Sequence, residues 1–187
     1  MTDGRIIFLH GASSSGKSTL ARALQARIEL PFWTISIDHL RDAGVLPRAR
    51  IESGEFHWRE MRPAFFDGFH RSLAAYVEAG NNLIVEHILD TPGWHAQLAA
   101  LLKPFDLFFV GVHAALADLQ RREAARGDRQ IGSAEHDFKT VHQGFTYDVE
   151  VSSSDRSVEE NVAAVLASWR QRTRSRFFEV KQTPGEG

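Results

Sequence analysis

Short apolar runs alternate along this chain with segments whose apolar residues recur every three or four positions. Five runs have the character of buried parallel strands: residues 5–10, 32–37, 82–85, 106–112 and 147–151. Helical spacing follows between them, most clearly over 17–29, 61–77 and 158–169. Strands that alternate with helices predict a three-layer α/β/α domain around a five-stranded parallel sheet.

The turn between the first strand and the first helix has the form G-x-x-x-x-G-K-[ST], a phosphate-binding loop, or P-loop. Its residues, with the threonine that follows, are Gly11, Ala12, Ser13, Ser14, Ser15, Gly16, Lys17, Ser18 and Thr19. We expect its amides to face phosphate oxygens, Lys17 to reach the β- and γ-phosphates, and Ser18 to bind Mg²⁺. A chance match in a Gly/Ser-rich turn is the alternative, and the flanking strand and helix disfavour it.

Acidic residues follow two of the other strands, where the ligands of an open α/β sheet bind. Asp38 stands after the second strand, so we expect it near the phosphates; an N-cap role is the alternative. Glu86 follows the third strand and is expected to hold Mg²⁺ through water or to orient an acceptor. His87 is either a substrate contact or a structural histidine.

Two further segments have a predicted place around this site. A basic stretch that contains Arg122, Arg126 and Arg129 is either a solvated helix face or a lid, at about 122–137, whose arginines close on the phosphate. Residues of about 39–78 are expected to form a helical insertion over the site. The aromatic stripe within it, which includes Phe65 and Phe66, is expected to pack in the core.

The composition is that of a globular protein with a core. The chain has 187 residues, 43% hydrophobic and 25% charged, which suits one domain over 1–180 with a flexible tail at 181–187. A net charge of -2 argues against a nucleic-acid partner. No apolar run could span a bilayer, and the absence of cysteine excludes thiolate metal sites and fits a cytoplasmic location.

One stretch, Asp90-Thr91-Pro92-Gly93, has the D-x-x-G form of a GTPase switch. No N-K-x-D guanine motif follows it, which argues against a GTPase. Thr91 as an N-cap with Pro92 at the first helical position explains the same residues.

Four stretches together resemble the chloramphenicol phosphotransferase-like family of P-loop kinases. They are residues 6–18, residues 37–40, residues 110–112 with 122–129, and residues 141–151 with its Tyr147-Asp148-Val149-Glu150-Val151 run. The resemblance implies a P-loop kinase fold with a substrate insertion and an Arg-rich lid. It also implies ATP- and Mg²⁺-dependent phosphorylation of a small-molecule hydroxyl, on an antibiotic such as chloramphenicol or a related alcohol.

The family's catalytic residues fall on matching positions of this sequence. Its aspartate falls on Asp38, its loop lysine and serine on Lys17 and Ser18, and its lid arginines on Arg126 and Arg129, with Arg122 beside the nucleotide. The sequence departs from the family around the acceptor: His39 replaces a serine, and Glu86-His87 replaces an acidic pair. We therefore take Asp38, His39, Glu86 and His87 as the candidate substrate residues.

Other activities fit the same motifs. A nucleoside or metabolite kinase of this fold, or a kinase acting on nucleic-acid ends, would share the P-loop. A non-catalytic nucleotide-dependent switch would have no need of Asp38 or of an arginine-rich lid. The sequence sets neither the acceptor nor the oligomeric state.

Overall fold

Parallel strands form a single sheet in the computed structural model, which describes residues 3–126 and 133–179. Within those residues the sheet has five strands in the order β2-β3-β1-β4-β5. Their bounds are β1 Arg5–His10, β2 Phe32–Ser36, β3 Asn82–His87, β4 Asp106–His113 and β5 Val149–Ser152. The predicted α/β fold and its five-stranded parallel sheet are confirmed.

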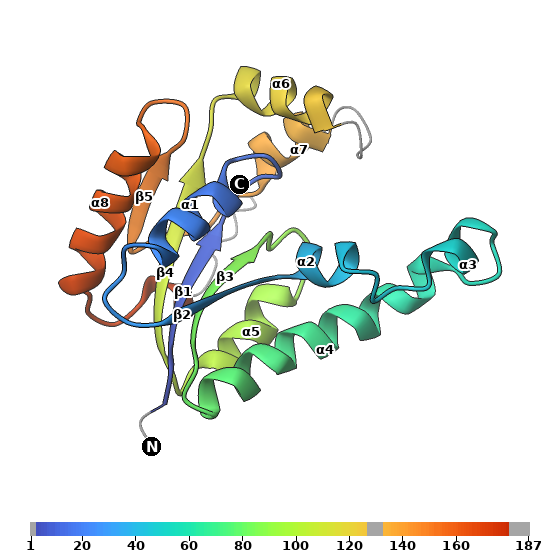
Figure 1. The fold of residues 1–187 in the computed structure, drawn as a ribbon, viewed down its shortest axis with the longest axis horizontal. Helices are drawn as coiled ribbons and strands as arrows, with labels where there is room; N and C mark the ends of the chain where they lie inside the picture. The colour runs from blue at the N-terminus through green and yellow to red at the C-terminus, as the bar shows by residue number, and fades with distance from the viewer. Residues whose placement is uncertain (1–2, 127–132, 180–187) are drawn as a thin grey trace, which may run out of the picture.

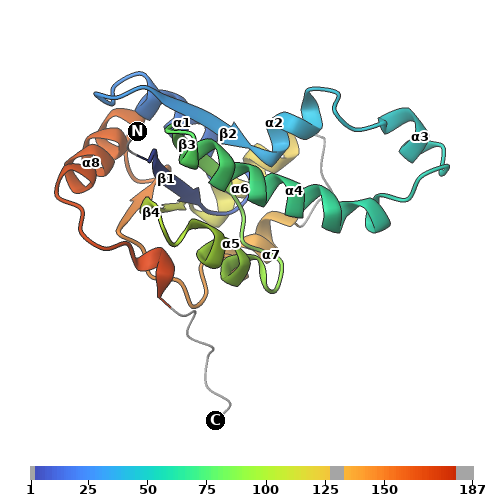
Figure 2. The ribbon, with the colours of Figure 1, turned by 90° about the horizontal axis from the view of Figure 1, so that it is seen from below.

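Helices cover both faces of this sheet (Figures 1 and 2). On one face lie α1 (Lys17–Gln25) and α8 (Val158–Arg170), and on the other lie α4 (Trp58–Glu78) and α5 (Trp94–Leu102). The remaining helical segments are α2 (Ile37–Asp42), α3 (Arg48–Glu52), α6 (Leu116–Arg126), α7 (Ser133–Thr140) and the 3-10 turn η1 (Arg176–Phe178). The short helices α2 and α3 lie between β2 and α4 in the chain, and α3 extends away from the sheet (Figure 1).

The two faces of the sheet differ in the side chains that fill them. Alternate residues of a strand point to opposite faces, so β1 sends Ile7 and Leu9 toward α1 and α8 but Ile6 and Phe8 toward α4 and α5. The first face is mostly aliphatic. The second contains a cluster of rings, in which Phe8 meets Phe109 and Phe177 with centroids 5.9 and 5.0 Å apart. Edge and tilted contacts of this kind are the favourable geometries for aromatic pairs.

The second face is closed by the segment after α8. Phe177 of η1 is fully buried, and Asp148 fixes the segment by accepting hydrogen bonds from the Ser175 hydroxyl (2.7 Å) and the Arg176 amide (2.9 Å). The same carboxylate accepts from the Phe109 amide at 2.7 Å. The Asp148 side chain therefore takes the place of a strand partner, which explains why β5 begins at Val149 and not at Tyr147 as predicted.

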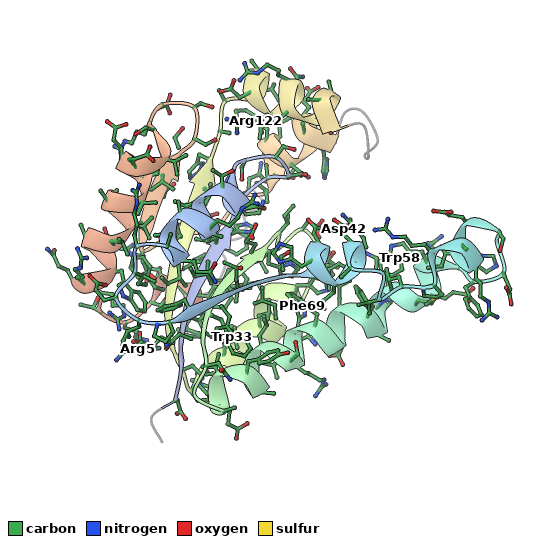
Figure 3. The ribbon with its side chains drawn as sticks, in the orientation of Figure 1. Arg5, Trp33, Asp42, Trp58, Phe69 and Arg122 are labelled. Carbon is green, nitrogen blue, oxygen red and sulfur yellow. The ribbon has the colours of Figure 1, made fainter. Side chains whose placement is uncertain are left out.

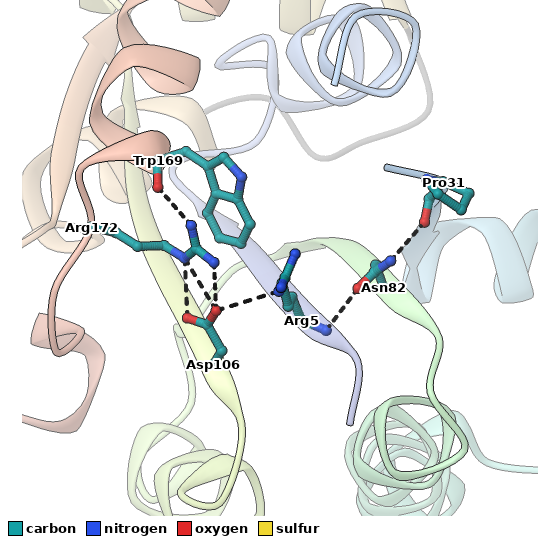
Figure 4. Close-up of polar contacts among 6 residues, drawn as sticks. All are labelled: Arg5, Pro31, Asn82, Asp106, Trp169 and Arg172. Atoms are coloured by element: carbon teal, nitrogen blue, oxygen red, sulfur yellow. Dashed lines mark hydrogen bonds and ion pairs between the residues drawn. The ribbon is translucent and has the colours of Figure 1, made fainter. Parts of the chain in front are cut away.

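Arg172, just after α8, makes several contacts with the rest of the protein. Its guanidinium lies 3.5 Å from the Trp169 ring centroid, donates to the Trp169 carbonyl at 2.8 Å and pairs with Asp106 at 2.6 Å (Figure 4). Asp106 also pairs with Arg5 at 3.7 Å, so the starts of β1 and β4 are tied to the end of α8.

The start of α5 also differs from the prediction. Gly93, with φ 87°, takes the N-cap position and α5 begins at Trp94, so the N-cap assignment of Thr91 was wrong. The Thr91 hydroxyl instead donates to Asp90 (2.8 Å) and accepts from Arg62 (3.2 Å). Asp90 and Thr91 are thereby drawn toward α4 and the cavity described below.

Other boundaries shift by a few residues. Helix α1 ends at Gln25 and not near residue 29. Just after Gln25 the backbone forms a tighter turn, in which the Arg27 amide donates to the carbonyl of Leu24, three residues earlier, at 3.0 Å. Ser157 and Glu160 form a capping box at the start of α8. Of the helices in the described part of the chain, none has the length and apolar character needed to cross a membrane.

Candidate active site

The loop between β1 and α1 has the tight backbone that a phosphate cradle needs. Gly16 caps α1 with φ 94°, a left-handed conformation that favours glycine, and Ser14 has φ 62°. A Cβ on Gly11 would lie 2.2 Å from the Val112 carbonyl oxygen, so only glycine lets the loop approach β4 this closely. The predicted P-loop sequence therefore adopts a strained, compact turn at a helix N-terminus, where anions bind.

The Lys17 side chain folds back over this loop. Its ammonium donates to the carbonyl oxygens of Gly11 (2.8 Å) and Ala12 (2.7 Å). Residues Ser13 to Thr19 line a cavity, whereas Gly11 and Ala12 are buried behind the loop and do not. Most of the residues predicted to bind the nucleotide thus face one cavity, whereas Gly11 and Ala12 are buried and support the loop from the interior.

An oxygen pair lies at the end of the loop. The Ser18 hydroxyl donates to Glu86 Oε2 at 2.6 Å, and Glu86 itself is buried at the end of β3, beside Leu9 of β1. A hydroxyl and a carboxylate are hard oxygen donors that suit Mg²⁺, which commonly takes one or two protein ligands and completes its shell with water and phosphate oxygens. Ser18 and Glu86 therefore fit the predicted metal role. Among the described residues there is no group of three or more His, Cys, Asp or Glu side chains that could hold a metal ion.

Asp38 lies in the first turn of α2, across the cavity from the P-loop. The Ser36 hydroxyl caps this helix by accepting from the His39 amide at 3.1 Å, so Asp38 is not its N-cap. Asp38 lines the cavity and pairs with Arg41 Nη2 at 3.2 Å. His39, predicted to contact substrate, is exposed on the outer side of α2 and does not line the cavity.

One cavity of about 750 Å³ joins these groups. It runs from Arg122 on α6, past the P-loop, to Trp58 at the start of α4 (Figure 3). The P-loop, Asp38, Glu86 and His87 all line it, so four separate chain segments meet there, counting Arg122. Its volume falls within the range of about 300–1,000 Å³ typical of small-molecule sites.

The wall opposite the P-loop is aromatic. Trp94 stacks on Phe66 with centroids 4.3 Å apart and planes 24° apart, and the Arg62 guanidinium lies 4.7 and 4.8 Å from the two ring centroids. Arg62 also pairs with Asp90 at 3.8 Å. Trp58 and Phe65 complete the wall and contact each other edge to face at 5.6 Å.

This wall contains residues that the sequence did not single out. Phe65 and Phe66 were assigned to the core, but they are half-buried and line the cavity, whereas Phe69 and Leu73 of the same helix are buried. The stripe therefore changes role along α4, because the first turns of the helix extend past the edge of the sheet. Arg41 and Arg62 carried no motif and were also missed, and Asp90 was noted only as part of the GTPase-like D-x-x-G stretch.

His87 forms the floor between the two halves of the cavity. Its Nε2 lies 2.9 Å from Nε2 of His70, and its ring stacks against Trp94 at 5.1 Å. Burial, helped by the neighbouring charges of His70, His10 and Lys17, holds the pKa of His87 well below its usual value. His87 is therefore neutral at neutral pH, and it lines the cavity.

Basic side chains flank the P-loop on its other side. Arg122 donates to the Ser14 carbonyl (3.0 Å) and to the Ser153 hydroxyl (2.9 Å), bridging the P-loop and the loop after β5. Arg156 of that loop also lines the cavity and was not predicted. Arg126 is the last residue of α6, and Arg129 with residues 127–132 lies outside the described part of the chain.

Helix α7 contacts the same loop. Asp137 Oδ2 accepts a hydrogen bond from the Ser13 amide at 3.1 Å. The end of the predicted lid, at about 122–137, therefore bonds to the P-loop backbone, and nothing in the sequence pattern marked Asp137 for this role.

Comparison with known proteins places this geometry among phosphotransferases. The model of the family described as chloramphenicol phosphotransferase-like protein matches residues 4–170. Two Mycobacterium tuberculosis proteins, from strains CDC 1551 / Oshkosh and H37Rv and both named "Putative O-phosphotransferase", are 27% identical to this chain. Each match covers 86% of this chain and 80% of the relative.

Solved structures share the fold at low sequence identity. The APS kinase CysC of M. tuberculosis, in complex with AMPPNP and APS, superposes with a TM-score of 0.66 at 18% identity, covering 91% of this chain and 99% of that one. A gluconokinase from Sinorhizobium meliloti 1021 gives 0.60 at 20% identity, covering 90% and 93%. At these identities the likeness establishes the P-loop kinase fold.

Proposed function

Because this chain belongs to the chloramphenicol phosphotransferase-like family, we propose that it transfers the γ-phosphoryl group of ATP to a hydroxyl of a small molecule. The observation that carries the proposal is the shared cavity, in which the P-loop and Asp38 face the same space beside an aromatic wall. A nucleotide-dependent switch would need the P-loop but neither Asp38 nor the aromatic wall.

The P-loop half of the cavity would hold the nucleotide. Its amides and Lys17 provide positive charge for the phosphates, and Arg122 and Arg156 line the end where the rest of the nucleotide would extend. Ser18 and Glu86 would hold Mg²⁺, which when bound neutralises charge on the phosphate oxygens. Arg126 and Arg129 are proposed to complete this positive charge.

Asp38 would orient the acceptor hydroxyl and take its proton. In the transfer, the hydroxyl oxygen forms a bond to the γ-phosphorus while the bond to the ADP oxygen breaks, and the proton passes to the Asp38 carboxylate. The transition state of such a transfer is loose, so positioning and charge stabilisation do most of the work. Arg41, 3.2 Å from Asp38, keeps the carboxylate in one orientation at the cavity wall.

The aromatic wall supports an acceptor with a flat or apolar part. Trp94 stacked on Phe66, with Trp58 and Phe65 beside them, offers broad ring faces. We therefore propose a drug-like alcohol such as chloramphenicol as the acceptor class, in a cytoplasmic enzyme that uses ATP and Mg²⁺. The likeness to proteins named O-phosphotransferase agrees with this class of reaction.

The test is a panel of alcohols incubated with γ-labelled ATP, Mg²⁺ and the purified protein. Chloramphenicol and related aromatic alcohols should gain label, whereas nucleosides, sugar acids and oligonucleotide ends should not. The Lys17→Ala variant is the inactive control, and it should also bind ATP more weakly. Stable ATP binding with no labelled product from any alcohol would favour the switch and overturn the proposal.

A further inference from the structure

A chain of hydrogen bonds leads from the surface of α4 to the cavity floor. Asp67 Oδ1 accepts from Gln97 Nε2 at 2.5 Å, Gln97 Oε1 lies 2.9 Å from His70 Nδ1, and His70 Nε2 lies 2.9 Å from His87 Nε2. The chain joins α4, α5 and β3, and none of its first three members carries a sequence motif.

The direction of this chain follows from its first member. The hydrogen bond from Arg71 lowers the pKa of Asp67, so Asp67 is an ionised carboxylate and only accepts. Gln97 must then turn its NH₂ toward Asp67 and its carbonyl oxygen toward His70. That oxygen requires a proton on His70 Nδ1.

The next bond is then fixed as well. Burial lowers the pKa of His70, so its ring is neutral at neutral pH. His87 is only 3% exposed and packs among the rings of Phe66, Phe69 and Trp94, where a charged imidazolium would be costly. A neutral His70 with its proton on Nδ1 has a lone pair on Nε2. His87 must therefore carry its own proton on Nε2 and donate to His70, which leaves His87 Nδ1 as a hydrogen-bond acceptor.

This acceptor nitrogen belongs to a residue that lines the cavity. His87 lines the cavity, its Nε2 is occupied by His70, and within the described residues no side chain or backbone group bonds to its Nδ1. The ring cannot turn freely, because Trp94 stacks on it at 5.1 Å and Phe69 meets it edge-on at 5.6 Å. A fixed acceptor therefore lies next to the face of Trp94.

We propose that His87 Nδ1 accepts a hydrogen bond from a second hydroxyl or N–H group of the acceptor substrate, and that His70 is the positioning residue that sets this polarity. The inference rests on the proposed function and narrows its substrate class. The substrate would be an alcohol with one hydroxyl at Asp38, a second donor at His87, and an apolar part on Trp94 and Phe66.

Protein NMR tests the polarity without any substrate. In ¹⁵N-labelled protein at pH 7, the His87 ring should show the Nε2–H tautomer and the His70 ring the Nδ1–H tautomer. A proton on His87 Nδ1 would overturn the proposal. Because this measurement needs neither ATP nor an acceptor, it is independent of whether the kinase assignment holds.

Two amide substitutions separate the roles of the two ring nitrogens. In His87→Asn the amide oxygen can stand near the Nδ1 position, whereas in His87→Gln the amide reaches the Nε2 position. With the first alcohol phosphorylated in the panel, His87→Gln should raise the acceptor KM about tenfold, the scale of an unsatisfied hydrogen bond, and His87→Asn only about threefold or less. The KM for ATP should stay unchanged in both. Equal losses in the two variants would show a merely structural histidine and overturn the proposal.

A charge change tests the positioning role of His70. The groups that face His70 and His87 are Gln97 from α5, Asp67 and Arg62 from α4, His10 from β1 and Lys17 from α1. In Gln97→Glu, a carboxylate beside Nδ1 favours protonated His70, whose Nε2–H would then force the His87 proton onto Nδ1. In this variant the acceptor KM should rise as pH falls, and the rise should begin at a higher pH than in the wild type.

The matched control is Gln143→Glu, the same substitution at an exposed position, where the side-chain amide donates to the Lys139 carbonyl. It should leave the pH profile of the acceptor KM unchanged. If Gln97→Glu and Gln143→Glu give the same profile, His70 does not set the polarity of His87 and the proposal fails.

Discussion

The phosphate-binding loop is eight consecutive residues, whereas the opposite wall of the cavity draws its side chains from α2, α4, β3 and α5. The loop works through backbone amides, a lysine and a hydroxyl, all of which the local turn places. The opposite wall works through stacked rings, an arginine and a buried histidine, which meet only when the second face of the sheet is packed. The proposed nucleotide half of the site is thus local in the chain, and the proposed acceptor half depends on long-range packing.

The largest expected effect tests the residue at which the two halves meet. Asp38→Asn keeps the shape of the side chain but removes its ability to take a proton. We expect phosphoryl transfer to fall about 10²–10⁴-fold, the usual range for a positioned acid–base group, with nearly unchanged ATP binding. Steady-state kinetics and ATP titration measure the two effects.

The control for this variant is Asp42→Asn on the same helix. Asp42 is exposed, pairs with Arg48 at 2.8 Å and does not line the cavity. Its turnover should remain near that of the wild type. Near-normal turnover in Asp38→Asn would remove that residue from the mechanism.

The next effect concerns the packing on which the acceptor half depends. Phe177→Ala removes a fully buried ring that contacts Phe8, Phe109 and His95 at centroid distances of 5.0 Å each. The free energy of unfolding should fall by about 3–5 kcal/mol, as for other buried aromatic truncations. Urea denaturation measures it, and Phe138→Ala, at a 45% exposed position, should change it by less than about 0.5 kcal/mol. A small effect at Phe177 would mean that the C-terminal segment does not hold the second face.

A pH effect of intermediate size should arise beneath the site. Burial lowers the pKa of His142 from 6.5 to about 3, and its Nδ1 lies 2.7 Å from the Tyr147 hydroxyl. Below pH 6.5 the unfolded chain binds a proton that the folded protein refuses, so stability is full above pH 6.5 and falls as pH drops toward 3. From this residue we expect a loss of about 2 kcal/mol by pH 5.

Denaturation curves at pH 7 and pH 5 measure this loss. His142→Gln removes the titrating group, so its stability should change less between the two pH values than that of the wild type. The same drop in both proteins would assign the pH dependence to other buried groups, such as His87.

The smallest effect should separate the two halves most cleanly. Trp94→Leu keeps an apolar side chain but removes the stack with Phe66 and the face below Arg62. The acceptor KM should rise roughly tenfold, while the KM for ATP stays the same, since aromatic stacking contributes about 0.5–1.5 kcal/mol beyond area burial. An equal rise in both constants would show that the wall is not specific to the acceptor.

The sequence predicted the sheet and the P-loop because both depend on patterns of residues that are close together in the chain. Apolar runs gave the five strands, and the spacing of Gly11, Gly16, Lys17 and Ser18 gave the loop. Strand ends gave Asp38 and Glu86, which do line the cavity. Their catalytic and metal roles stay predictions.

The rest of the site could not be read in this way. Phe66 and Phe69 share one helical stripe, yet one lines the cavity and the other is buried, because the edge of the sheet falls between them. Asp137 and the partners of His87 act across more than ten residues of sequence, so no local spacing marks them. His39 was wrongly expected to face the same space as Asp38, although adjacent helical residues point about 100° apart.

The first turns of α4 have a consequence for how this protein could acquire a new preference. Four residues within a stretch of nine project beyond the sheet and contribute little to the hydrophobic core: Trp58, Arg62, Phe65 and Phe66. Substitutions within this stretch could therefore change which acceptor the protein prefers without altering the phosphate-binding loop. Among relatives that differ in this stretch, we expect the preferred acceptor to change more than the ability to bind a nucleotide.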